Sequence, residues 1–261
     1  MTRTVSSTLF VASVSLGALV AASSSSGCVS YAQPHAFDVG RGAEPLPTGT
    51  MQAHGAVWGG PMNLSTADFP VAVQGGAGVE GQLADDLAVG FDLGTGVEGT
   101  AVKGTAMPTS GMITFQYNPN GMHNLAIRGA GGIGEDVVNL PNQKTELSPW
   151  GAVDAGIVTS TKLGPVDGYF GLDVGGHRFI GGQDSLIIVH TKGSGLTNTM
   201  YNADATLGAN IAFGDLGVFV SANLGGLMLL ADETGDANAQ PTFLPNSFGL
   251  VGVTYHFDAP Q

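Results

Sequence analysis

Three charged side chains are the first candidates for joint chemistry. Arg128 lies in an apolar, glycine-rich stretch, and Asp92 and Asp154 lie in similar stretches on either side of it in the chain. A charge withdrawn from water needs a partner of opposite sign, because an unpaired buried charge is costly. We therefore predict that Arg128 bridges Asp92 and Asp154 inside the molecule, a structural role that neutralises these charges.

A second pair, Asp173 and His177, carries the groups used in general acid–base catalysis. The two residues are four positions apart on one expected strand, so both side chains project from the same face. An imidazole activated by a carboxylate acts as a general base. The sequence contains neither the G-x-S-x-G motif of serine hydrolases nor the H-E-x-x-H spacing of zinc proteases. We expect no catalytic residue, no metal ligand and no cofactor, with a hydrolase as the alternative.

The elements that hold these residues are recognised by the alternation of apolar and polar side chains. From Tyr201 to Phe213 every second residue is apolar, and the residues between them are mostly polar or small. A period of two is typical of a β-strand with one apolar face and one polar face. The same pattern predicts ten strands, at 50–59, 70–83, 87–94, 112–117, 122–133, 150–163, 168–180, 200–213, 216–230 and 247–257. Residues 185–192 are a candidate extension of a neighbouring strand, so eight to twelve strands fit the pattern.

The connections between these strands alternate in length. Those after the even-numbered strands are tight and contain turn-forming residues, as at Gly164-Pro165 and Gly214-Asp215. Those after the odd-numbered strands are longer, at roughly 60–69, 95–111, 134–149, 181–199 and 231–246. Tight turns on one side and longer loops on the other are typical of membrane barrels, and a soluble sandwich has no reason to follow that rule. The predicted fold class is all-β, a single antiparallel up-and-down transmembrane β-barrel over residues 50–257.

The composition excludes several other classes of protein. The 261 residues include 42 Gly, and 21 Asp plus Glu against 8 Lys plus Arg give a formal charge of −13. The chain is 43% apolar, which is too hydrophobic for a highly charged disordered protein. No basic stripe is present for nucleic-acid binding, and the glycines keep no collagen period. Beyond the N-terminus, no apolar run approaches the roughly 20 residues of a membrane helix.

The first 28 residues are predicted to be an export signal. Arg3 precedes an apolar stretch that is followed by small residues, which is the arrangement of a cleaved secretory signal peptide. Ser26-Gly27-Cys28 resembles the end of a lipobox, so Cys28 is the predicted lipidation site, and cleavage after Ala32 is the alternative. Because Cys28 is the only cysteine, no intramolecular disulfide can form. Residues 29–49 are expected to be an extended periplasmic linker.

The last predicted strand carries the most specific family resemblance. Residues 251–257 (VGVTYHF) alternate and end in an aromatic residue, with Tyr255 two places before Phe257. Together with the alternation along 50–257, this resembles the bacterial outer-membrane β-barrel proteins and their C-terminal insertion signal. The resemblance implies location in the cell outer membrane, contact with its lipid, and recognition of the strand ending at Phe257 by the barrel-assembly machinery. The sequence departs from the family pattern by continuing as a short tail, 258–261.

Aromatic residues near the strand ends are expected to form two interfacial girdles, because aromatic rings favour the membrane–water interface. The periplasmic girdle would contain Tyr117, Tyr169, Phe213, Tyr255 and Phe257. The girdle at the opposite rim would contain Trp58, Trp150 and Tyr201.

Turning the apolar face toward lipid directs polar residues into the lumen. Six of them form the predicted lumen network: Arg128, Asp92, Asp154, Asp173, His177 and Asp204. The others are Gln52, His54, Gln74, Glu80, Gln116, Lys162, Asn210, Asn223 and His256. Inward acids outnumber inward bases, so any aqueous path through this lumen should prefer cations.

These features favour a passive role, either as a structural or surface barrel or as a narrow pore that side chains largely fill. The alternative is an outer-membrane barrel hydrolase with Asp and His chemistry near the outer rim. A third hypothesis is a soluble exported β-protein with a ligand cavity. We expect no nucleic-acid partner, and the sequence does not determine the oligomeric state.

Overall fold

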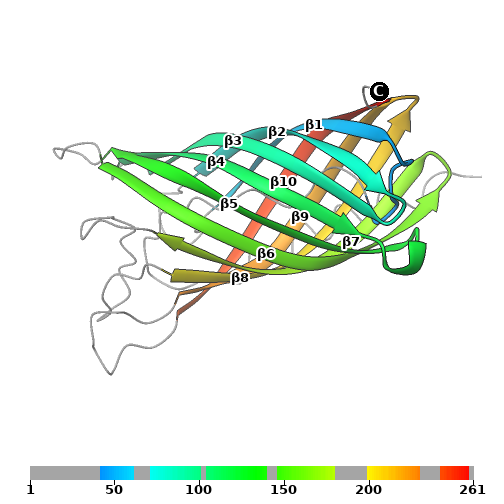
Figure 1. Ribbon diagram of the computed structural model, residues 1–261. Coiled ribbons are helices and arrows are strands. Elements are labelled where there is room, and N and C mark those ends of the chain that lie inside the picture. Colours follow the sequence, from blue (N-terminus) through cyan, green and yellow to red (C-terminus); the bar gives the residue numbers. More distant parts are fainter. Residues whose placement is uncertain are drawn as a thin grey trace, which may run out of the picture.

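The computed structural model describes residues 42–61, 71–100, 104–139, 146–179, 199–229 and 242–258. Ten antiparallel strands form one closed barrel, in which each strand pairs with its neighbours in the chain and β1 pairs with β10 (Figure 1). The strands are β1 (Thr50–Pro61), β2 (Val71–Ala84), β3 (Leu87–Thr100), β4 (Gly104–Tyr117), β5 (Leu125–Asn139), β6 (Glu146–Leu163), β7 (Val166–Phe179), β8 (Thr199–Phe213), β9 (Leu216–Leu229) and β10 (Thr242–Asp258). The predicted fold class is confirmed.

The tight connections gather at one end of the barrel, which we call the turn end; the opposite end is the loop end (Figure 1). At the turn end, β6 and β7 are joined by Gly164-Pro165, and β8 and β9 by Gly214-Asp215. Both glycines have positive φ, 67° and 68°, and the residue after each does not. Glycine at the first central position of a two-residue loop gives the type II′ turn, whose twist matches that of a hairpin.

All ten predicted strands are present, but several continue further toward the loop end than the alternation indicated. β3 extends to Thr100 and β4 begins at Gly104, so residues 101–103 alone connect them. The connection between β4 and β5 at the turn end, residues 118–124, is longer and contains the short 3-10 helix η2 (Pro119–Gly121). The expected alternation of connection lengths is therefore wrong at these two places. Residues 185–192 lie outside the described residues.

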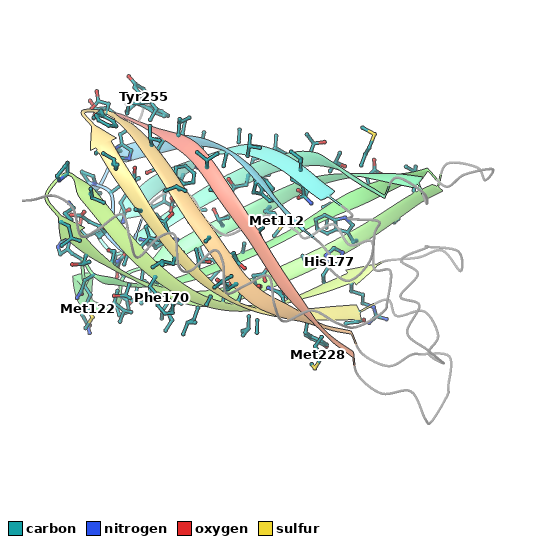
Figure 2. All side chains as sticks on the ribbon, turned by 180° about the vertical axis from the view of Figure 1, so that it is seen from behind. Met112, Met122, Phe170, His177, Met228 and Tyr255 are labelled. Carbon is teal, nitrogen blue, oxygen red and sulfur yellow. The ribbon has the colours of Figure 1, made fainter. Side chains whose placement is uncertain are left out.

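Most large apolar side chains of the strands face outward, and most polar side chains face the lumen. Large hydrophobic residues such as Leu93, Ile133 and Leu207 are exposed, whereas Gln52, Glu80 and Asp204 are buried. Figure 2 shows the same division, with Phe170 and Tyr255 projecting outward and Met112 on the inner side. This is the inverse of a soluble barrel, and it is the arrangement of a barrel embedded in lipid. Among the described residues, no helix is long and apolar enough to cross a membrane.

The structure places only some of the predicted girdle residues on the outer face of the barrel. Tyr117, Phe213 and Tyr255 are exposed near the turn end, and Tyr201 is exposed near the loop end. Trp58, Trp150 and Tyr169 are buried in the lumen instead. The reason is their position in the alternation, since each occupies the same face of its strand as the inward polar residues.

Candidate functional site: the polar lumen

The inner wall carries all fifteen polar side chains that the alternation directed into the lumen. Fourteen of them are buried or half-buried, and Lys162 is exposed at the turn end of β6. The residues of each strand are paired laterally with those of its neighbours, so inward residues form rows around the wall. Which side chains meet depends on these rows, and three rows hold the candidate chemistry.

One row joins a histidine to a carboxylate across a glycine. His54 on β1 is paired with Gly78 on β2, and Gly78 is paired with Asp92 on β3. The His54 Nε2 atom lies 2.5 Å from an Asp92 carboxylate oxygen. A Cβ atom at Gly78 would overlap that oxygen, so the absence of a side chain there allows the two groups to meet. His54 and Asp92 were both expected in the lumen, but their pairing was not predicted.

A second row is built in the same way on the opposite wall. Asp154 on β6 is paired with Gly175 on β7, which is paired with Asn202 on β8. The Asn202 amide donates to Asp154 at 3.2 Å and to Asp204 at 2.8 Å. One amide group therefore holds two inward carboxylates side by side, which compensates part of the cost of their burial.

Arg128 does not form the predicted bridge. Its Nε atom donates to Gln116 at 2.9 Å, and its Nη2 atom donates to the carbonyl of Gly42 at 2.8 Å. The register explains the difference, because Asp154 is paired with Ala130, two residues further along β5 than Arg128. The row of Arg128 instead runs through Gly156 to Asp173 and then Asp204.

The alternative catalytic pair, Asp173 and His177, is not brought together. Four residues of strand separate them by about 13 Å along β7, because each residue of a strand rises about 3.3 Å. His177 is buried and its ring lies against Trp150, with the ring centroids 4.6 Å apart. Asp173 lines a cavity together with Arg128, Tyr169 and Thr206. The structure therefore gives no general-base geometry to this pair.

The residues just before β1 enter the lumen at the turn end. Ala43 is fully buried against Ala126, Val158 and Tyr169. Its carbonyl accepts hydrogen bonds from Asn118 at 2.6 Å and Gln116 at 3.1 Å. The predicted linker 29–49 thus differs from the structure in its last part, because residues 42–46 are bound to the barrel wall.

Neither a metal centre nor a lipid site is assigned by the geometry. Within the part of the chain that the structure describes, no group of three or more His, Cys, Asp or Glu residues is arranged to hold a metal ion. Cys28, the predicted lipidation site, and the signal peptide 1–28 lie outside the described residues and stay predictions.

No protein-family model matches the chain, and no curated protein matches it. Solved structures of similar architecture include the translocator domain of the autotransporter NalP from Neisseria meningitidis, with 13% identity and a TM-score of 0.42 over 82% of this chain and 91% of that one. The COG4313 outer membrane channel from Pseudomonas putida F1 gives 13% identity and a TM-score of 0.42, over 86% of this chain and 100% of the other. LpxR from Salmonella typhimurium gives 9% and 0.40, over 80% and 100%. The closed ring of ten antiparallel strands is itself what defines the fold as a β-barrel.

Proposed function

We propose that this protein is a passive outer-membrane β-barrel with a narrow, cation-preferring aqueous path through its lumen. The single observation that supports the proposal best is the closed wall with an apolar exterior and a polar interior. A lipid-facing exterior needs only aliphatic and aromatic side chains, whereas a polar interior is favourable only where water or polar partners fill it.

Large inward side chains make the path narrow. Trp58, Phe219 and Leu250 pack together on the wall formed by β1, β9 and β10. Trp150, Met112 and Tyr169 are buried against the other strands. A barrel of ten strands is only slightly wider than the eight-stranded barrels whose interiors side chains fill. We therefore expect wild-type protein to conduct weakly.

The charge of the wall supports a preference for cations. Inward carboxylates are contributed by Glu80, Asp92, Asp154, Asp173 and Asp204, whereas Arg128 is the one arginine among the expected lumen residues. Oxygen atoms of Asp204, Asn210 and Asn223 that face the lumen have no hydrogen-bond partner among the described residues. Buried polar atoms of this kind are normally satisfied by water, and carboxylate-lined water favours positive ions.

The test is ion conductance in planar bilayers, with selectivity read from the reversal potential in a salt gradient. Wild-type protein should give small currents that favour cations, and Asp154→Asn with Asp204→Asn should lower the cation preference at least twofold. Asp215→Asn, at an exposed turn between β8 and β9, is the control and should leave the preference unchanged. Large steady wild-type currents would contradict a narrow path, and anion preference or no current at all would contradict the proposal.

A further inference from the structure

We propose that residues 42–46, the N-terminal segment, are a plug that closes the turn end of the lumen and limits its conductance. This inference rests on the proposed function, since a plug can limit conductance only if an aqueous path runs through the lumen. The segment belongs to the same chain as the barrel, so the proposed occupant of the lumen is a part of this protein.

The segment crosses the mouth of the barrel. It leads into β1, yet Gly42 and Ala43 are bound by Asp167 on β7 and by Ser160 on β6. β6 is the fifth strand from β1 in a closed ring of ten, so it lies on the opposite wall. Between these ends, Gln82 on β2 accepts a hydrogen bond from the backbone of Leu46 at 3.1 Å.

Side chains of the barrel wall form hydrogen bonds with both the backbone N–H groups and the backbone carbonyl groups of the segment. The Gly42 amide donates to Asp167 and its carbonyl accepts from Arg128. The Ala43 amide donates to Ser160 at 3.0 Å, and its carbonyl accepts from both Gln116 and Asn118. Outside this core, Glu44 forms an ion pair with Lys162. Complete pairing of buried peptide groups is the mark of a specific docking site, because each unpaired group would cost free energy.

The site also selects small side chains. Ala43 is 0% exposed and fills the space between Ala126, Val158 and Tyr169. A Cβ atom at Gly42 would meet the Cβ atom of Ser160, so only glycine can approach the wall this closely. Thr48, by contrast, is exposed, and its hydroxyl donates to the turn residue Asp85. The first two residues of the segment are therefore the seal, and Thr48 lies outside it.

Docking is tested by a disulfide cross-link in a Cys28→Ser background, using the full chain refolded in detergent. Ala43→Cys with Ala126→Cys should cross-link in high yield on mild oxidation. Ala43→Cys with Ala152→Cys is the matched control, because Ala152 is equally inward and buried but lies outside the cluster; its yield should be at least tenfold lower. Equal yields from the two pairs would overturn docking.

Sealing is tested by conductance of Gly42→Val, with Thr48→Val as the matched control. Gly42→Val introduced into the Ala43→Cys and Ala126→Cys chain should abolish the cross-link, and alone it should raise the current at least fivefold with unchanged cation preference. Thr48→Val should leave both unchanged. The gel migration of unboiled protein verifies that each barrel is folded.

The outcomes separate the two proposals. If Gly42→Val abolishes the cross-link, and wild-type and Gly42→Val barrels both conduct and carry equal currents, the plug is overturned and the pore stands. If the cross-link is lost but neither barrel conducts, the aqueous path itself is overturned, and the sealing role falls with it. A cross-link that persists in Gly42→Val together with an unchanged current would overturn the assignment of Gly42 as part of the seal.

Discussion

At the scale of single residues, glycine on the inner wall determines which side chains can meet. His54 and Asp92 come from strands that are not neighbours, and Gly78 on the strand between them leaves the space in which they pair. Gly175 does the same for Asp154 and Asn202. Close lateral packing of this kind accounts for part of the high glycine content of the chain, and it makes the inner glycines sensitive to substitution.

Gly78→Ala should destabilise the barrel by about 1–3 kcal/mol, the usual cost of overpacking a tight interior. The added methyl group would lie within 2.7 Å of both the His54 Nε2 atom and the carbonyl of Phe91, so the His54 and Asp92 side chains must separate. The measurement is the urea midpoint of refolding into lipid vesicles. Gly55→Ala is the control, because its Cβ atom would meet nothing closer than 3.7 Å; an equal loss in both variants would contradict a specific role of Gly78.

The face of each inward residue could be predicted from the alternation, but its partner could not. The burial of Trp58 and Trp150 could have been predicted, since both are even-numbered on strands whose even residues point inward. The partner of Arg128 could not have been predicted in this way, because Gly42 lies 86 residues earlier in the chain. Pairs such as His54 with Asp92 depend on the register between neighbouring strands. The alternation of apolar and polar residues determines the face of each side chain but not this register.

At the scale of elements, the strands follow the alternation where one face meets lipid and lose it beyond. β3 and β4 continue for several residues past the predicted ends at 94 and 112. Only about 9–11 tilted residues are needed to cross the hydrocarbon. Beyond that length the outer face is no longer in contact with lipid and need not be apolar. The alternation of apolar and polar residues is therefore lost, although the backbone pairing of the strands continues. The strand ends at the turn end were therefore predicted closely, whereas at the loop end five strands extend beyond their predicted bounds, namely β3, β4, β5, β6 and β10.

Depth in the membrane should therefore determine the cost of a charge on the outer face. Leu207→Arg, in the middle of β8, is expected to cost about 2–4 kcal/mol, and Leu83→Arg, beside the β2–β3 turn, about 0–1 kcal/mol. The two leucines are 66% and 67% exposed, so the comparison isolates depth. Refolding titrations in urea with lipid vesicles give both values. Equal costs would show that this face does not lie in hydrocarbon.

At the scale of the whole molecule, stability depends on the seam between the first and last strands. β1 and β10 pair from Thr50 with Asp258 to Gly59 with Gly249, and this pairing removes the two free sheet edges that an open sheet would expose. Unpaired backbone groups cannot remain in lipid, where each would cost several kcal/mol. Closure is accordingly an all-or-none property, and it links residues that are 190 to 208 positions apart in the chain.

The full barrel should resist SDS and migrate faster on a gel before boiling than after it, because a closed barrel without edges remains compact in detergent. A chain that ends at residue 241 lacks β10 and leaves one edge of β1 and one edge of β9 without a partner strand. It should show a single band that migrates like the boiled protein. A chain that ends at Asp258 is the matched control, because it removes only residues after the last strand and should keep the fast band. If the chain without β10 also migrates fast, closure through the β1–β10 seam is not what holds the barrel together. If the full chain shows no fast band after refolding, the closed barrel itself is contradicted.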